Sequence, residues 1–265
     1  MRLYVHAKIT VQCPLPCPVV AMLRPRSGAA QWVVSERYEI PASLRPHEYE
    51  DPFGNVCQRF VVPQGSTTIA VQSEVEVDDT LAVEPQAEQT PFELLPDDAL
   101  VFLLQSRYCP SDKIVDQARN VVGRLPPGYQ QVEAIRRWIH ETHEYRYGVS
   151  DATTDALDTM QAKAGVCRDF AHIGVTLCRA LRIPARMVVG YLYQLDPMDL
   201  HAWFEAFIGG RWYTFDATQK EPRGGRVVLA YGRDAADVAF LSNYGDMEVA
   251  NMEVGVQLSQ SGATF

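Results

Sequence analysis

One stretch constrains this chain more than any other: residues 165–172, which read Gly-Val-Cys-Arg-Asp-Phe-Ala-His. The stretch predicts a sharp turn at Gly165, where a glycine lets the backbone bend tightly, followed by a buried helix that begins at Cys167. Apolar residues that recur at three- and four-residue steps indicate the helix. These residues are Phe170, Ala171, Gly174, Leu177, Cys178 and Leu181. Because Cys167 lies three residues before Phe170, it begins the same apolar face.

Cys167 has two interpretations at this position. The N-terminus of a helix carries about half a positive charge, so a thiol placed there ionises more easily, and the thiolate is the nucleophilic form. This argues for a catalytic cysteine. Cysteine is also among the residues most often found in protein cores, which argues for a structural role. The stretch alone supports both interpretations equally, and residues further along the chain decide between them.

Composition narrows the class of protein and its surroundings. The 265 residues suffice for one large domain or two ordinary ones, and 47% apolar with 22% charged residues is typical of a globular protein. The formal net charge of −9 argues against a nucleic-acid partner and against an anionic membrane. No stretch approaches the roughly 18 apolar residues of a membrane span. Residues 1–8 also lack the apolar core of a signal peptide, so we expect a cytoplasmic protein with reduced cysteines.

Cys13 and Cys17 form a close pair in the sequence Cys-Pro-Leu-Pro-Cys. Their spacing suits a metal clip, but no second pair follows at the spacing that metal ligands use. We therefore expect no metal, and the chemistry considered below requires no cofactor.

Residues 1–80 predict an antiparallel β-sandwich without catalytic groups, because strand-like runs alternate with turn residues and no helical period interrupts them. The expected strands are residues 4–11, 31–40, 56–62 and 66–77. Residues 81–97 contain three prolines among acidic residues and glutamines, and this composition predicts a linker.

Residues 98–240 predict a second, helix-containing domain. Ser111 and Thr154 are expected to cap helices, and a longer helix should end near His140 and His143, which we interpret as solvated or capping histidines. An apolar strand should follow at 186–193. In the tail 241–265 apolar residues alternate with others at Met252, Val254, Val256 and Leu258, and this pattern predicts a strand that packs back on the body. The fold class expected for the whole chain is α+β, an N-terminal sandwich followed by helices packed on an antiparallel sheet.

A β-hairpin is indicated where two strand-like runs, 201–208 and 211–216, flank Gly209 and Gly210. With the two glycines as the loop, His201 faces Thr218, and Asp216 is the diagonal neighbour of His201 on the same face. A four-residue loop would place them directly opposite. Both registers bring the imidazole and the carboxylate together, whereas a slip by one residue would turn every side chain to the wrong face.

A thiol at a helix start, with a histidine and an aspartate on a hairpin, is what a Cys-His-Asp acyl-transfer site needs. The base polarises the thiol, and the carboxylate orients the imidazole. His172 is a poor alternative base, because five residues along a helix place it about 140° around from Cys167. The three side chains could also bind zinc, but a fourth ligand and closely spaced pairs are missing from the sequence.

Four motifs in this order resemble the bacterial transglutaminase-like family, whose members are often described as cysteine proteases. They are Gly-Val-Cys-Arg-Asp-Phe-Ala-His at 165–172, Leu-Cys-Arg-Ala-Leu-Arg-Ile-Pro-Ala-Arg-Met-Val-Val-Gly-Tyr at 177–191, His-Ala-Trp-Phe-Glu-Ala-Phe-Ile at 201–208 and Trp-Tyr-Thr-Phe-Asp-Ala-Thr at 212–218. Residues 231–238 match too, as does the β-rich N-terminal region with its Asp-Pro-Phe-Gly-Asn turn at 51–55.

The resemblance implies a papain-like core with Cys167 as nucleophile, His201 as base and Asp216 as orienting acid. The family usually has proline where Ala217 stands, a departure that leaves the carboxylate in place. The expected activity is thiol-dependent acyl transfer or hydrolysis at an amide bond of a peptide or a glutamine side chain, through a thioester.

The backbone N–H of Cys167 would form half of an oxyanion hole. Gln161 could supply the other donor, although a solvent-facing or capping glutamine is an equally good interpretation. The alternative to an enzyme is a peptide-binding or scaffolding module that keeps the fold without turnover. In both cases the expected partner is a protein or peptide, and the sequence allows a homo-oligomer.

Overall fold

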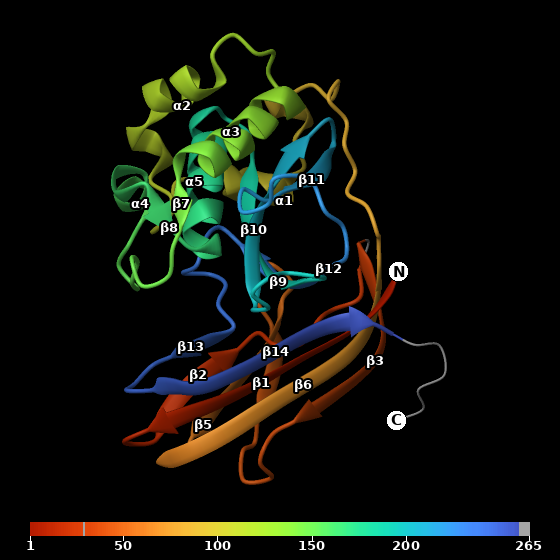
Figure 1. Ribbon diagram of the computed structural model, residues 1–265, viewed down its shortest axis with the longest axis vertical. Coiled ribbons are helices and arrows are strands. Elements are labelled where there is room, and N and C mark those ends of the chain that lie inside the picture. Colours follow the sequence, from red (N-terminus) through yellow and green to blue (C-terminus); the bar gives the residue numbers. More distant parts are fainter. Residues whose placement is uncertain (29, 260–265) are drawn as a thin grey trace.

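The computed structural model describes residues 1–28 and 30–259, which form two β-sheets packed as a sandwich and a helical half built on a third sheet (Figure 1). The first sandwich sheet has the order β14-β1-β6-β3, and the second has the order β13-β2-β5-β4. Their strands are β1 (Arg2–Cys13), β2 (Cys17–Ala21), β3 (Gln31–Glu39), β4 (His47–Glu50), β5 (Val56–Val62), β6 (Gly65–Val77), β13 (Leu241–Asn243) and β14 (Glu248–Leu258).

Period-two alternation explains why the N-terminal residues form this sandwich. Along β1, alternate side chains from Leu3 to Cys13 are buried, while those between them are more exposed. The four strands expected from the sequence correspond to β1, β3, β5 and β6. The strands β2 and β4 were not expected, because they are short and leave few residues in which a pattern can show.

The C-terminal tail completes both sandwich sheets. β14 pairs antiparallel with β1 from Leu3↔Leu258 to Gln12↔Glu248, and β13 pairs with β2. The sandwich is therefore assembled from residues at both ends of the chain: residues 1–80, which the sequence predicted as a sandwich, and the tail, which it predicted as a strand packing back on the body. Residues 260–265 of the predicted tail lie outside the described residues.

The other half of the molecule contains a four-stranded antiparallel sheet of order β11-β10-β9-β12 and the helices that cover it. Its strands are β9 (Ala185–Leu192), β10 (His201–Ile208), β11 (Arg211–Phe215) and β12 (Arg226–Gly232), and a small parallel pair joins β7 (Glu144–Tyr145) to β8 (Ala164–Gly165). The helices are α1 (Asp97–Leu100), α2 (Val115–Val122), α3 (Tyr129–Thr142), α4 (Ala156–Ala162) and α5 (Cys167–Ala180), with short 3-10 turns at Phe92–Leu94, Val101–Leu103 and Ser111–Lys113. The arrangement confirms the predicted α+β class.

Helix α5 packs directly on β10 and forms the centre of this half (Figure 1). From Asp169 to Ala180 all of its residues are buried, including the apolar face expected from the sequence. Gly174 makes the close approach to the sheet, because a Cβ added there would lie 2.4 Å from Cε1 of Phe204. The helix that begins at Cys167 is thereby held at a fixed height above β10.

Two side-chain amides join the sandwich to β12. Gln31 donates from Nε2 to Val228 O at 2.8 Å and accepts from Val228 N at 2.7 Å. Asn55 makes the same pair of contacts with Tyr231, at 2.8 and 3.0 Å. Each amide replaces the backbone partner that another strand would supply, so the sandwich fixes the position of β12.

Two expected helix caps differ in the structure. Asp155, not Thr154, caps α4, because its side chain accepts hydrogen bonds from Leu157 N and Asp158 N. The hydroxyl of Thr154 instead donates to Asp151. Ser111 begins a 3-10 turn that precedes α2. Among the described residues, no helix is both long and apolar enough to span a membrane.

Candidate active site

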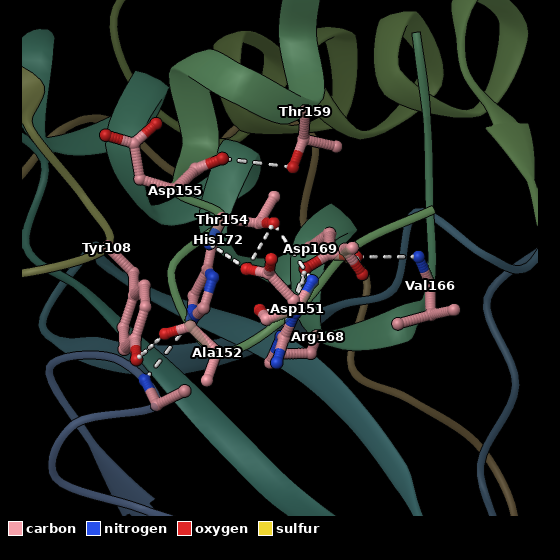
Figure 2. A network of polar contacts seen from close by, with 12 residues as sticks. Tyr108, Asp151, Ala152, Thr154, Asp155, Thr159, Val166, Arg168, Asp169 and His172 are labelled. Atoms are coloured by element: carbon pink, nitrogen blue, oxygen red, sulfur yellow. Dashed lines mark hydrogen bonds and ion pairs between the residues drawn. The ribbon is translucent and has the colours of Figure 1, made fainter. Parts of the chain in front are cut away.

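Cys167 is the first residue of α5, and its side chain is partly exposed. Asp169, which is fully buried, organises the chain around it (Figure 2). Its carboxylate accepts from Val166 N at 2.9 Å and from Ser150 Oγ at 2.6 Å, and it pairs with Arg168 at 2.9 Å. A carboxylate in the first turn satisfies free N–H groups of the helix and favours its positive end.

His201 begins β10 and Asp216 directly follows β11, and the two side chains meet, as the hairpin predicted. The ladder pairs Ile208 with Arg211, so the glycine pair forms a two-residue loop and that register is confirmed. His201 Nε2 lies 2.8 Å from Asp216 Oδ2, and both side chains are almost completely buried. Because Nε2 faces the carboxylate, Nδ1 is the ring nitrogen left for the thiol.

Two further residues hold the Asp216 carboxylate, and the sequence did not single out either of them. Arg226, at the start of β12, donates from its guanidinium to Oδ2 at 2.8 Å, and both side chains are buried. Thr218 donates to Oδ1 from its hydroxyl at 2.7 Å and from its backbone N–H at 3.0 Å. The carboxylate therefore has a full set of donors and one fixed orientation.

The electrostatics of the pair follow from this geometry. Burial alone would lower the pKa of His201, but the charge and hydrogen bond of Asp216, and then Cys167, raise it to about 9. Burial alone would raise the pKa of Asp216, but His201 and Arg226 hold it well below its usual range. The imidazolium is thus the favoured form of His201 near neutral pH.

Cys167 and His201 are neighbours in the folded chain, since Cys167 contributes by hydrogen bond and by charge to the raised pKa of His201. The structure therefore brings together all three residues that the sequence proposed. Figure 1 shows how this happens: the start of α5 lies beside β10, and β11 is the next strand of the sheet.

Helix α3 fixes the loop that follows Asp216. His140 Nδ1 lies 3.0 Å from Ala217 O, and Arg136 donates to Gln219 O at 2.7 Å. His140, interpreted from the sequence as solvated or capping, thus contacts the backbone next to the site. His143, also expected to be solvated or capping, is buried against Trp138 and Phe170, and burial lowers its pKa.

His172 points away from the thiol, as its position on the helix implied. Its ring stacks on Tyr108 with centroids 5.1 Å apart, and Nε2 accepts from Ala235 N at 3.2 Å (Figure 2). Complete burial, and then Arg168, lower the pKa of His172 to about 3. It is therefore a neutral core histidine.

Gln161 lies near the end of α4 with an exposed side chain. Within the described part of the chain its side chain makes no hydrogen bond to a residue of the site. Its expected role as an oxyanion donor stays a prediction.

A pocket of about 470 Å³ opens beside His201 and Thr218. Its lining also includes Tyr145 and Tyr147 after α3, and residues 195–197, 199 and 200 from the loop before β10. The pocket gives a substrate access to the imidazole. In residues 1–28 and 30–259, no group of three His, Cys, Asp or Glu side chains could hold a metal ion.

Comparisons with known proteins agree with this arrangement. The model of the transglutaminase-like superfamily matches residues 115–217, and that of the bacterial transglutaminase-like N-terminal region matches residues 16–78. A crystal structure of a candidate cysteine protease from Cytophaga hutchinsonii has 36% sequence identity and a TM-score of 0.93, and the match covers 100% of this chain and 92% of that one.

Two mycobacterial relatives also match over most of their length. An uncharacterised protein of Mycobacterium leprae is 28% identical, covering 91% of each chain. An uncharacterised protein of Mycobacterium tuberculosis is 27% identical, covering 89% of this chain and 84% of the relative. With the two family models and the Cytophaga structure, these matches show that the chain belongs to the transglutaminase-like superfamily and carries its bacterial N-terminal region.

Proposed function

We propose that the protein is a thiol-dependent enzyme that acts on amide bonds of a protein or peptide through a thioester on Cys167. The observation that carries the proposal is the position of His201, which contacts the Asp216 carboxylate through Nε2 at 2.8 Å and interacts with Cys167. A histidine held between a thiol and a buried carboxylate is suited to accept the proton of the thiol, while the carboxylate orients the imidazole ring.

Proton transfer from the Cys167 thiol to His201 gives a thiolate and an imidazolium before the substrate reacts, in keeping with the imidazolium as the favoured form of His201. The thiolate adds to the amide carbonyl carbon, and the imidazolium then donates its proton to the leaving amine as the C–N bond breaks. A thioester remains on Cys167. Water, or a second amine, attacks the thioester with His201 acting as base and restores the thiol.

Asp216 and Arg226 act on the imidazole and not on the substrate. The buried carboxylate stabilises the imidazolium, which is the form of His201 in the ion pair with the thiolate and in the tetrahedral intermediates. Arg226 keeps the carboxylate ionised and fixes its orientation. We propose a cytoplasmic location as well, since the six cysteines are all unpaired and a reducing compartment keeps them so.

The acyl donor is testable with a peptide library and an amine-tagged probe. The wild-type protein should transfer the tag to a subset of peptides, or cleave or deamidate them, and the product identifies the acceptor as amine or water. Cys167→Ala should abolish all products, whereas Cys178→Ala, which removes a buried thiol on the same helix, should leave them. Products that persist in Cys167→Ala would contradict the proposal.

A binding module that does not turn over is the competing function. It predicts that peptides bind the wild type and Cys167→Ala with equal affinity and that no covalent intermediate forms. The interaction between Cys167 and His201 favours the enzyme, because a peptide-binding surface has no need of a thiol placed against a histidine.

A further inference from the structure

Backbone pairing between β7 and β8 places Tyr145 beside the segment that leads into α5. Tyr145 ends β7 and pairs in parallel with Gly165 of β8, two residues before the nucleophile. Two backbone hydrogen bonds of 2.9 Å fix this register, from Glu144 N to Lys163 O and from Arg146 N to Gly165 O. The position of Tyr145 relative to Cys167 is therefore set by secondary structure and not by a free loop.

Aromatic contacts orient the Tyr145 ring. It meets Phe170 edge-on, with centroids 5.9 Å apart at 76°, and meets Tyr147 in the same way, at 5.5 Å and 83°. Phe170 lies one helical turn from Cys167 on the same face of α5. The phenol is within interaction range of the thiol, and the ring lines the pocket that opens beside His201.

We propose that the Tyr145 hydroxyl is the second oxyanion donor, completing with the Cys167 backbone N–H the hole that stabilises the tetrahedral intermediate. This inference rests on the proposed function, since it assigns a role in the same acyl transfer. The first N–H groups of a helix have no intrahelical acceptor, so that of Cys167 is free to donate. The exposed Gln161 was the donor that the sequence suggested, whereas Tyr145 interacts with the thiol.

The sulfur lone pair of Cys167 forms the C–S bond while the carbonyl π pair moves to oxygen, which becomes the oxyanion. Tyr145 and the backbone N–H of Cys167 donate hydrogen bonds to that oxygen without giving up their protons. When the oxygen pair re-forms the carbonyl, the C–N bond breaks and the amine leaves with the proton from His201.

A hydrogen-bond donor of this kind must stay protonated, and Tyr145 does. Burial, and then the charge of Cys167, raise the pKa of the Tyr145 phenol far above its usual range. Donors aimed at the developing charge have their largest effect in such partly water-excluded sites.

The test compares two reactions of the same thiol. Acylation by p-nitrophenyl acetate passes through an oxyanion, whereas alkylation by iodoacetamide does not. Tyr145→Phe keeps the ring contacts and removes only the hydroxyl. We expect acyl-enzyme formation at Cys167 to slow by roughly 10²-fold, as when one oxyanion donor is lost elsewhere. The alkylation rate should change by less than about threefold. Tyr244→Phe, at an exposed tyrosine far along the chain, is the matched control.

The outcomes separate this inference from the proposed function. Unchanged acylation in Tyr145→Phe, with a normal acyl-enzyme in the wild type, would overturn the role of Tyr145 alone. Equal loss of acylation and alkylation would also overturn it, because the hydroxyl would then act on the thiol itself. A wild type that forms no acyl-enzyme at Cys167 would refute both. A fluorinated tyrosine at position 145, which ionises at lower pH, should lose acylation as the pH rises through its pKa.

Discussion

His201 and Asp216 remain in contact beyond the point where their strands stop pairing. The ladder between β10 and β11 ends at Phe204 and Phe215, yet Nε2 and Oδ2 are 2.8 Å apart. The donors on Thr218 and Arg226 hold the carboxylate in place there, so the contact depends on these side chains as well as on the register of the hairpin. Each of these side chains can be changed separately.

Asp216→Asn should separate orientation of the imidazole from reactivity of the thiol. A neutral amide favours the wrong tautomer of His201, so we expect acyl-enzyme formation to fall by roughly three to four orders of magnitude. Alkylation of Cys167 should fall less, because the helix start and the imidazole both remain. His201→Ala, measured in the same way against pH, should depress both reactions. Wild-type rates in both variants would mean that Cys167 works with another base.

Arg226→Gln should lower the free energy of unfolding markedly, whereas the reactivity of the Cys167 thiol should change little. Removing Arg226 from this buried ion pair leaves the buried charge of Asp216 less well neutralised. We therefore expect the free energy of unfolding to fall by about 3 kcal/mol. His201 still contacts the same carboxylate, so alkylation of Cys167 should be less affected than in Asp216→Asn. Urea denaturation measures the first effect. Arg119→Gln, at an exposed ion pair, is the control and should have almost no effect.

Only Cys167 should react with iodoacetamide in the folded protein at mildly acidic pH. The other five cysteines are buried, and burial raises the pKa of Cys57 to about 11 and that of Cys109 to about 12. Mass spectrometry of alkylated peptides locates the labelled thiols. Equal labelling of all six, or none at Cys167, would count against a thiolate stabilised by His201.

The free energy of unfolding should fall as the pH rises from about 6.5 to about 9. The pKa of His201 is raised in the folded state to about 9, from an ordinary value of 6.5. Its contribution is therefore complete below about pH 6.5 and is lost as the pH rises through 9. The full contribution is on the order of 3 kcal/mol. Denaturation curves of His201→Gln should lack this slope, and an equal slope in both proteins would assign it to other groups.

Asn55→Ala should loosen the sandwich from β12. The change leaves the backbone N–H and C=O of Tyr231 without partners in a partly buried setting, and we expect a loss of about 2 kcal/mol in the free energy of unfolding. Hydrogen exchange at Tyr231 should rise as well. Asn251→Ala, on the exposed face of β14, serves as the control. Unchanged exchange at Tyr231 would show that β12 holds its position without the sandwich.

The features that depend on neighbours along the chain could be predicted from the order of the amino acids. The helix that starts at Cys167 follows from apolar residues at three- and four-residue steps, and the contact of His201 with Asp216 follows from a two-glycine loop. Both rest on local geometry, in which the spacing of residues sets which side chains share a face.

The distant side chains that complete the site are brought to it by the packing of the whole fold. Arg226 reaches Asp216 because β12 joins the sheet beside β9, and Tyr145 reaches Cys167 because β7 pairs with β8. The tail enters the sandwich through β14, and Asn55 fixes β12 from the other half of the molecule. No periodicity in the sequence encodes these contacts, because they join segments whose separation along the chain does not restrict their distance in space. They form only where packing brings buried polar groups together and each must find a partner.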